Sequence, residues 1–433
     1  MNIAIIGAGY VGLTSAAVFA KLGHKVWVLD TAQEKIRLLK HGKVHFYEPQ
    51  LPELIRGAVK KKQLVPTESY AVALKSADVI FVCVGTPPLE TGESDLSQVF
   101  HAAEQIAKYL KKDCVVVMKS TVPVGTTEKI KEIIKKKTAV SFDVASSPEF
   151  LREGSAVSNT LYPDRIVIGV ESNHTAKILT AKILLKLHEK LLGERVITDL
   201  RTAEIIKYAS NAFLATKISF INEIANLCDS VGANVDDVAL GMGLDPRIGK
   251  AFLKAGIGYG GSCFPKDTKA LHRVAISNAY NFKLLKAVIE VNQTQRRLFL
   301  GKVRRELGTL EKKNIGVLGL AFKNNTDDVR ESAAMDIIQW LINEGANVKA
   351  YDPKAMQNAK KIIHKLKICK KPEEVALKAD ALLILTEWEE FKNLPWPLIK
   401  KKMRDAIIFD GRNLINPQSI RKYGFKYMSI GRP

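Results

Sequence analysis

The sequence predicts an α/β protein with two doubly wound parallel sheets joined by a central helical layer, on three observations. Short apolar runs typical of buried parallel strands alternate with helical patterns in the first third of the chain. A similar alternation returns in the last third, with segments that resemble those of the first. The middle is helical, without a strand pattern. We therefore expect three domains, at residues 1–199, 200–306 and 307–433.

The N-terminal segment has the pattern of a dinucleotide-binding turn. The apolar run Ile3–Ile6 leads into G-x-G-x-x-G at Gly7–Gly12, and a helical pattern follows from Leu13 to Leu22. A second strand, Val26–Leu29, ends at Asp30. In this context the three glycines make the turn, admit the pyrophosphate and let the helix pack on the strand. Asp30 favours NAD over NADP, because a carboxylate binds the ribose hydroxyls and repels a 2′-phosphate.

Polar clusters follow the other strands of this first sheet. They are Gly85–Pro88, Lys119–Thr121 and Ser147–Gly154. Ligands of open α/β sheets bind beyond the carboxyl ends of the strands, so we expect these clusters to line a site. Two alternatives stay open. Glu149 and Glu153 also suit the start of a helix after Ser147-Pro148, and Lys35 is either a ribose contact or a solvated lysine.

The middle of the chain predicts two long helices, from Leu200 to Val231 and from about Asp267 to Glu306. Lys207 and Asn211 are four residues apart, so they face the same side of the first helix. Lys207 has apolar neighbours, and it either lines a site or extends its stem toward solvent. Two long helices without a strand between them predict a helical layer and a dimer interface.

The last third of the chain repeats the first. The matching pairs are Gly23–Asp30 with Gly345–Asp352, Ser76–Val82 with Lys378–Ile384, and 112–117 with 404–409. The matching first strand, at 315–320, continues as Ala-Phe-Lys-Asn-Asn and lacks the glycine pattern. We therefore expect a second sheet of the same kind that takes a different phosphorylated ligand. Lys323 is the candidate point charge on phosphate, and Arg330 is a further candidate.

A glycine-rich loop with one cysteine, Gly256–Asp267, lies between the two helical patterns. Four glycines precede Cys263, and they let the backbone approach a ligand closely. Lys266 and Asp267 follow it and offer the charges that a thiolate or an oxyanion needs. The alternative is a surface loop with an incidental cysteine.

Composition narrows the class of partner. Lys and Arg (66) exceed Asp and Glu (45), and the net charge of +21 favours anionic partners. The basic residues come in scattered runs, at Lys60–Lys62, Lys135–Lys137 and Lys400–Lys402, without an interleaved aromatic platform. This distribution favours a phosphorylated small molecule over nucleic acid.

Cysteine usage and the N-terminus predict the compartment. Five cysteines at wide spacings, without Cys-x-x-Cys, argue against a disulfide framework or a metal site and suit a reducing compartment. The uncharged run from Ile3 to Ala20 is broken by glycines and hydroxyl residues, so we interpret it as neither a signal peptide nor an anchor. We expect a cytoplasmic protein with no membrane partner.

Together these motifs resemble those of the UDP-glucose/GDP-mannose dehydrogenase family over nearly the whole chain. The segments that carry the resemblance are Gly7–Leu13, Thr86, Lys119–Thr121, Ser147–Gly154, Lys207 with Asn211, Gly258–Asp267, Ala321–Lys323 and 330–332. The resemblance implies two Rossmann-like domains, a helical connection that forms a homodimer, and oxidation of a sugar C6 alcohol to a carboxylate with two NAD. Tyr259–Asp267, and Arg247 ahead of Phe252–Gly256, most resemble members that act on UDP-glucose. GDP-mannose and N-acetylated UDP-sugars are the alternatives.

The resemblance also implies roles for single residues. The catalytic set is Cys263 as nucleophile through a thiohemiacetal and a thioester, Asp267 as base through water, Glu149 as base for hydrolysis, Lys207 and Asn211 on the oxyanion, and Thr121 on water or a sugar hydroxyl. The cofactor set is Gly7, Gly9, Val11, Gly12, Asp30, Lys35, Thr86, Thr121, Glu153, Lys266 and Arg330. The UDP-sugar set is Glu149, Phe150, Leu151, Arg152, Glu153, Lys207, Asn211, Arg247, Phe252, Leu253, Lys254, Ala255, Gly256, Gly260, Lys323 and Arg412. A rival on the same scaffold, a 6-phosphogluconate or hydroxy-acid dehydrogenase, transfers one hydride and needs no cysteine.

Overall fold

The structure is a computed structural model of the 433-residue chain, and it describes residues 1–171 and 174–433. The chain forms two compact units, Met1–Ser210 with Arg273–Ala279, and Asn211–His272 with Tyr280–Pro433. Each unit contains one of the two sheets. Among the helices of the described residues, none is both long and apolar enough to cross a membrane.

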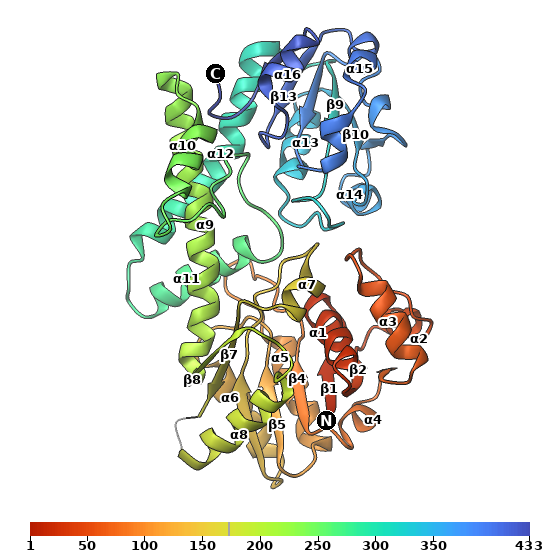
Figure 1. The fold of residues 1–433 in the computed structure, drawn as a ribbon, viewed down its shortest axis with the longest axis vertical. Helices are drawn as coiled ribbons and strands as arrows, with labels where there is room; N and C mark the ends of the chain where they lie inside the picture. Colours follow the sequence, from red (N-terminus) through yellow and green to blue (C-terminus); the bar gives the residue numbers. More distant parts are fainter. Residues whose placement is uncertain (172–173) are drawn as a thin grey trace. The chain divides into compact units, whose positions relative to one another are not determined.

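The first unit is built on an eight-stranded sheet in the order β3-β2-β1-β4-β5-β6-β7-β8 (Figure 1). The strands are β1 Asn2–Ile6, β2 Lys25–Leu29, β3 Leu64–Thr67, β4 Val79–Val82, β5 Cys114–Met118, β6 Phe142–Ser146, β7 Arg165–Val170 and β8 Glu194–Asp199. The first six are parallel in the Rossmann order. β7 is antiparallel to β6 and parallel to β8.

Helices cover both faces of this sheet. They are α1 Tyr10–Lys21, α2 Gln33–Lys40, α3 Leu51–Lys60, α4 Tyr70–Leu74, α5 Ser97–Tyr109, α6 Thr126–Lys137, α7 Ala156–Leu161 and α8 His174–Leu187. Alternate residues of β1 show why the strand is apolar from Ile3 onward. Ile3 and Ile5 pack in one core with Leu13 of α1, while Ala4 and Ile6 pack in another with residues of α5 and α6.

The second unit contains a six-stranded, fully parallel sheet in the order β11-β10-β9-β12-β13-β14 (Figure 1). Its strands are β9 Asn314–Leu318, β10 Asn347–Tyr351, β11 Lys367–Ile368, β12 Ala381–Ile384, β13 Ile407–Asp410 and β14 Lys426–Met428. Its helices are α13 Ala333–Asn343, α14 Met356–Ile362, α15 Trp396–Lys402 and α16 Pro417–Lys422, with 3-10 turns at Pro372–Glu374 and Glu389–Asn393. Counted from β9, the strand order is again the Rossmann order. The predicted fold class is therefore confirmed.

The middle of the chain forms four helices, α9 Leu200–Val231, α10 Val235–Gly243, α11 Phe264–Ser277 and α12 Lys283–Leu307. The first predicted helix is confirmed, but the prediction of one helix from Asp267 to Glu306 was wrong. The chain leaves the helix after Ser277, where Ala279 takes a left-handed φ of +55°. Ile221 of α9 and Phe299 of α12 share a core with Val317 of β9, so these helices pack on the second sheet.

Candidate functional site

The space around each glycine of the first βα turn shows why that glycine is needed. Gly7 has φ +105°, and its N–H donates to the Leu29 carbonyl at 2.7 Å. A Cβ on Gly7 would lie 2.5 Å from the Cys83 carbonyl oxygen, and one on Gly12 would lie 1.9 Å from the Gly7 oxygen. A Cβ on Gly9 would meet nothing within 4 Å. Gly7 and Gly12 thus shape the turn, and Gly9 leaves open space where a ligand can approach the backbone.

The same turn offers groups for a dinucleotide. α1 begins directly after Gly9, which has no side chain that could cap the helix, and the N-terminus of a helix attracts an anion. Asp30 accepts hydrogen bonds from Ala8 N at 2.8 Å and Ala32 N at 2.9 Å, and Lys35 Nζ lies 3.1 Å away. Burial raises the pKa of Asp30, but these amides and Lys35 outweigh burial and lower it overall. An ionised Asp30 suits ribose hydroxyls, so these residues fit NAD.

A buried ion pair lies just beyond the carboxyl end of β6. Glu149 Oε1 is 2.9 Å from Lys207 Nζ, and the two side chains are 7% and 4% exposed. Glu149 Oε2 accepts the Leu151 N–H at 2.6 Å, and the Phe150 ring centroid lies 5.5 Å from Lys207 Nζ. Lys207 therefore does not extend its amine to solvent, and its place in a site stays a prediction. Because both charged groups are held without bulk water, their fields act strongly on a neighbouring reacting atom.

The loops after β4 and β5 are joined to each other. Thr86 Oγ1 donates to the Thr121 carbonyl at 2.9 Å, and Ser120 Oγ donates to the Val84 carbonyl at 2.7 Å. The structure thus brings together two residues that we predicted for the cofactor.

Two buried carboxylates shape this region although the sequence analysis missed them. Glu48 accepts N–H groups of Gly154 at 2.6 Å and Ala156 at 2.7 Å, and so holds the segment that follows Glu149. Glu204 accepts Gly125 N at 2.6 Å and Thr127 N at 2.9 Å at the start of α6, and burial raises its pKa. Glu204 could have been predicted from the sequence, because it lies one turn before Lys207. Glu48 had no such signal, because its partners lie more than 100 residues away.

In the second unit, Cys263 stands at the N-terminus of α11. Its carbonyl accepts the Asp267 N–H at 2.8 Å, which is the first hydrogen bond of the helix. The side chain is partly exposed, and Ser262 Oγ lies 3.7 Å from its Sγ. The positive end of a helix stabilises an anion, so this position favours a thiolate.

Asp267 lies on the first turn of the same helix and is 1% exposed. Its Oδ2 accepts Asn211 Nδ2 at 2.6 Å, and its Oδ1 pairs with Lys266 Nζ at 2.6 Å. Three predicted site residues are therefore connected by direct hydrogen bonds, one turn from the cysteine.

Three buried amides hold the backbone of the glycine loop, and we did not predict them. Asn222 Oδ1 accepts Gly256 N at 2.8 Å, and Gln295 Nε2 donates to Gly256 O at 3.0 Å. Asn292 Oδ1 accepts Tyr259 N at 2.7 Å, and its Nδ2 donates to Tyr259 O at 3.1 Å. The sequence offered one signal for these residues, which is that their amide side chains lie within apolar helical patterns. Because these amides fix the loop, the cysteine is held in place rather than on a flexible turn.

The glycines of this loop allow close packing on the segment after β9. A Cβ on Gly260 would lie 2.2 Å from the Glu331 oxygen, and one on Gly261 would lie 2.6 Å from the Phe322 ring. Gly261 N also donates to the Arg330 carbonyl at 3.0 Å.

Arg412 connects the loop to the second sheet. Its guanidinium donates to the carbonyls of Leu385 at 2.9 Å, Gly258 at 3.1 Å and Phe322 at 3.0 Å. These bonds position the loop, and the sugar contact stays a prediction for Arg412.

The other predicted residues differ in exposure. Glu153, Leu253, Ala255 and Gly256 are buried, Val11, Leu151, Phe252 and Lys323 are half-buried, and Arg152 and Lys254 are exposed. Arg247 is 88% exposed and pairs with Asp245, and Arg330 is 60% exposed and pairs with Asp328. Their ligand contacts stay predictions.

Comparison with known proteins places the chain. Three sequence models of one family match it in order, the NAD binding domain at residues 1–191, the central domain at 201–294 and the UDP binding domain at 316–417. The chain belongs to the UDP-glucose/GDP-mannose dehydrogenase family. The NAD-binding model covers Gly7–Gly12 and Asp30, so the predictions of the family and of NAD are confirmed.

Similar members of this UDP-glucose/GDP-mannose dehydrogenase family include UDP-glucose 6-dehydrogenase TuaD of Bacillus subtilis, which is 48% identical over 100% of this chain and 93% of its own. UDP-glucose 6-dehydrogenase of Rhizobium meliloti is 46% identical over the full length of both chains. A solved UDP-glucose dehydrogenase from Pyrobaculum islandicum superposes with a TM-score of 0.92 at 36% identity, covering 99% of this chain and 96% of its own.

Proposed function

We propose that this protein oxidises UDP-glucose to UDP-glucuronate, with two NAD reduced for each sugar. The observation that carries the proposal is the thiol of Cys263 at the start of α11, one turn from the buried Asp267 and its partner Asn211. A thiol allows a second oxidation at the same carbon, because the aldehyde can be held as a covalent adduct. The relatives at up to 48% identity support this reaction class and substrate.

In the first oxidation, Asp267 takes the proton of the C6 alcohol through a water molecule, and Lys207 stabilises the developing oxyanion. The first βα turn would hold NAD, which would supply the hydride acceptor for each oxidation. The direct bond from Asn211 to Asp267 orients the carboxylate, while Thr121 positions water or a sugar hydroxyl. The product of this step is an aldehyde.

In the second oxidation, the Cys263 thiolate adds to the aldehyde carbon and gives a thiohemiacetal. Loss of a hydride from that carbon leaves a thioester, and Lys207 and Asn211 hold its oxygen. Glu149 then removes a proton from the attacking water, the carbon–sulfur bond breaks, and Cys263 leaves as a thiolate. The sugar carboxylate is released.

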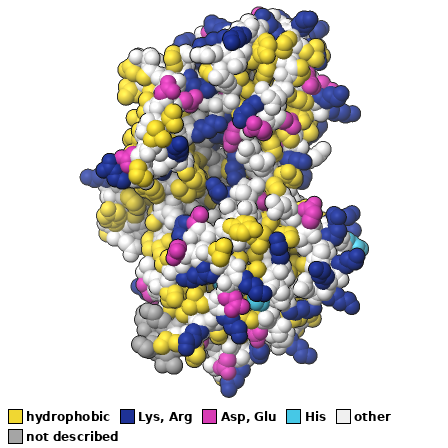
Figure 2. All heavy atoms as spheres, in the orientation of Figure 1, with side chains coloured by type: hydrophobic (Ala, Val, Ile, Leu, Met, Phe, Trp, Pro, Cys, Tyr) yellow, Lys and Arg dark blue, Asp and Glu magenta, His cyan; other side chains and the backbone are white. Residues whose placement is uncertain are grey.

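The remaining contacts complete the proposal. The UDP-sugar is held by Glu149–Glu153, Phe252–Gly256, Gly260, Lys323 and Arg412, with Arg247 reaching the sugar carboxylate of a neighbouring subunit. NAD contacts come from Val11, Lys35, Thr86, Glu153, Lys266 and Arg330. Domains at residues 1–199, 200–306 and 307–433 would divide these tasks. Lys and Arg are spread over the face seen in Figure 2 among acidic and apolar side chains, which favours a small phosphorylated ligand over nucleic acid.

Substitution of the cysteine tests the mechanism. Cys263→Ser should abolish release of the uronate while leaving a first oxidation or a trapped intermediate, as measured by NADH absorbance and intact mass. Cys369→Ser is the matched control, because Cys369 is also a partly exposed thiol but lies beyond β11. Uronate production at the wild-type rate by Cys263→Ser would rule out the covalent mechanism. Assaying UDP-glucose, GDP-mannose and N-acetylated UDP-sugars side by side tests the substrate.

We also propose a cytoplasmic homodimer, assembled through α9. Phe213, Phe220 and Leu227 recur at seven-residue spacing and are 66%, 48% and 57% exposed, with Val231 one turn beyond at 66%. Such a row of exposed apolar side chains on one helix face is typical of an interface. Light scattering after chromatography should give twice the chain mass for the wild type and the chain mass for Phe220→Asp. A wild-type monomer at micromolar concentration would contradict the dimer.

A further inference from the structure

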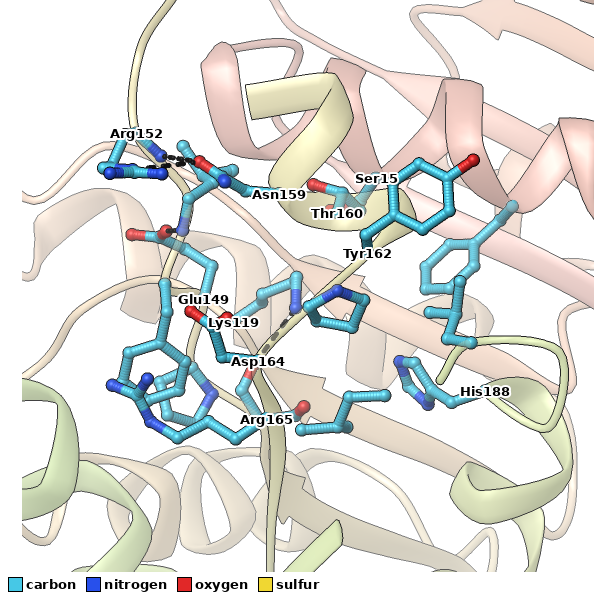
Figure 3. Close-up of a pocket in the computed structure, with 18 residues that line it drawn as sticks. Ser15, Lys119, Glu149, Arg152, Asn159, Thr160, Tyr162, Asp164, Arg165 and His188 are labelled. Carbon is cyan, nitrogen blue, oxygen red and sulfur yellow. Dashed lines mark hydrogen bonds between the residues drawn. The ribbon is translucent and has the colours of Figure 1, made fainter. Parts of the chain in front are cut away.

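The first unit contains a cavity of about 90 Å³ that has one wall at Glu149 (Figure 3). It is partly open to solvent, and its lining comes from α1, the end of β5, the segment after β6, α7, the start of β7 and the residues that follow α8. Ser15, Lys119, Asn159 and His188 also line it (Figure 3). The mechanism uses Glu149 alone among these residues. Lys119 belongs to the Lys-Ser-Thr motif, whose lysine has no role in the mechanism described so far.

The polar groups of this cavity lack enough protein partners. Ser15 is 1% exposed, and its Oγ has no hydrogen-bond partner among the described residues. Lys119 is 9% exposed, and its Nζ is bonded to the Ser147 carbonyl at the long distance of 3.4 Å. An amine of either charge has at least two N–H groups, so at least one of them needs another acceptor. Buried polar groups are almost always hydrogen-bonded, and water commonly supplies the missing partner.

The charge of Glu149 acts on Lys119. Burial lowers the pKa of Lys119, and the nearby Cys83 and Glu149 oppose that effect. His188 is neutral, because burial lowers its pKa to about 4, and its Nδ1 donates to the Leu184 carbonyl at 2.8 Å. The cavity therefore has hydrogen-bonding groups on several sides. Its volume exceeds the roughly 10–15 Å³ that one water needs, so it has room for several waters.

We propose that Lys119 and Ser15 hold water in this pocket, and that Glu149 draws from it the water that hydrolyses the thioester. The inference rests on the proposed function and deepens its last step. Glu149 suits this use, because it lines the cavity while its Oε1 contacts Lys207, the residue that holds the oxyanion. Lys119 is a positioning residue, since it acts through water and Glu149.

The step is a hydrolysis without redox change. One water oxygen forms a bond to the acyl carbon, and its proton passes to Glu149. The carbon–sulfur bond breaks with its electron pair going to Cys263. A water from the cavity replaces the one consumed, so the site is ready for the next turnover.

Lys119→Met tests the proposal, because it keeps the length of the side chain and removes the hydrogen-bonding group. We expect hydrolysis to slow about tenfold or more, a part of the roughly 10²–10⁴-fold that general-base catalysis contributes. A burst of two NADH per active site should precede a slow steady state. Rapid quench and intact mass should then find the acyl adduct on Cys263 in most of the enzyme. Lys129→Met, an exposed lysine of α6, should behave as the wild type.

Equal slowing of both oxidations and of hydrolysis, without an adduct, would overturn the proposal and assign Lys119 to folding. If Lys119→Met does not fold, the variants Ser15→Val and Ser15→Ala test the proposal instead. The Ser15→Val enzyme, whose larger side chain fills the pocket, should accumulate the acyl adduct, and the Ser15→Ala enzyme should accumulate much less of it. Equal amounts of adduct in the two variants would overturn the proposal. A wild type that makes no NADH from UDP-glucose would instead overturn the proposed function.

Discussion

The two sheets of the chain begin in the same way. Gly7 and Gly319 follow their first strands with φ of +105° and +97°. Their N–H groups donate to the last residue of the neighbouring strand, at 2.7 Å to the Leu29 carbonyl and at 2.8 Å to the Tyr351 carbonyl. The repeated strand order and the repeated turn show that one scaffold was used twice, so the differences between the sheets point to what each binds.

The first difference is where the helix begins. α1 begins at Tyr10, directly after the glycine turn, whereas α13 begins at Ala333, well beyond Gly319. In the first sheet, the N-terminus of a helix therefore lies directly at the turn, where it attracts an anion. In the second sheet, the inserted segment contains Lys323 and packs its Phe322 against the thiol loop.

The second difference is the acid that ends the second strand of each sheet. Asp30 is partly exposed, accepts two backbone N–H groups and pairs with Lys35. Asp352 is fully buried and accepts the N–H groups of Leu320, Ala321, Lys354 and Ala355 and the Trp388 indole, all within 3.1 Å. The carboxylate that is available to a ribose in one sheet is therefore a structural acceptor in the other.

The largest expected effect that separates the sheets is that of Gly12→Ala. The new Cβ would lie 1.9 Å from the Gly7 oxygen, so the turn must open and NAD binding should be lost. Titration calorimetry measures the binding, and the melting curve reports the fold. Asn324→Ala, at the same distance from Gly319 as Gly12 is from Gly7, should leave NAD affinity unchanged. Loss of NAD binding in the Asn324 variant would contradict the assignment of the dinucleotide turn to the first sheet.

The two acids should respond in opposite ways to alanine. Asp352→Ala should lower the free energy of unfolding by about 4 kcal/mol, because buried N–H groups lose their acceptor. Asp30→Ala should raise the Kd of NAD about tenfold, as expected for a lost charged hydrogen bond. Denaturant unfolding and NAD titration on both variants measure these effects. Similar losses of stability in both variants would show that the two acids do the same job.

Acid should weaken the first unit through His188. Its pKa is about 4 when folded, against 6.5 when unfolded, so between these values the unfolded state binds more protons. The neutral ring makes its whole contribution to the free energy of unfolding above pH 6.5. This contribution decreases as the pH drops and is lost near pH 4. At 1.36 kcal/mol per pKa unit, the whole contribution is about 3 kcal/mol.

Urea unfolding at pH 7.5 and pH 5 measures this loss, and His188→Gln should remove that part of the pH dependence. The described histidines of the second unit, His272 and His364, are half-buried and exposed, so its transition should shift less. Acid sensitivity that persists unchanged in His188→Gln would contradict the role of this ring.

The last expected effect, of the same size as that of Asp30→Ala on NAD, is on the UDP-sugar. Lys323→Met removes the point charge of the inserted segment, so the KM for UDP-glucose should rise about tenfold while the KM for NAD stays unchanged. Steady-state kinetics measure both. Lys365→Met, an exposed lysine after α14, is the control. A change in the KM for NAD alone would reverse the assignment of ligands to the two sheets.

Local patterns were enough to predict both sheets, because apolar runs and their glycine endings depend on neighbouring residues. They also led to the predictions for Cys263, Lys207 and Asn211, which share helices or turns with recognisable motifs. The break at Ala279 was missed, because alanine rarely takes a left-handed φ and gives no signal for it.

Long-range partners were also missed. Glu48 and Asn292 act on backbone groups about 106 and 33 residues away, and no spacing rule reports such contacts. From the sequence, we predicted that Arg412 binds a sugar. In the structure, its guanidinium donates hydrogen bonds to three backbone carbonyls. Side chains that hold loops and side chains that hold ligands look alike until the fold is known.

The most direct test of the account is the number of NADH formed for each UDP-glucose consumed, measured at 340 nm with limiting sugar. If Cys263 makes two oxidations at one carbon possible, each UDP-glucose consumed should give two NADH and one UDP-glucuronate. One NADH per sugar, with an aldehyde as the product, would contradict the central role of the thiol loop.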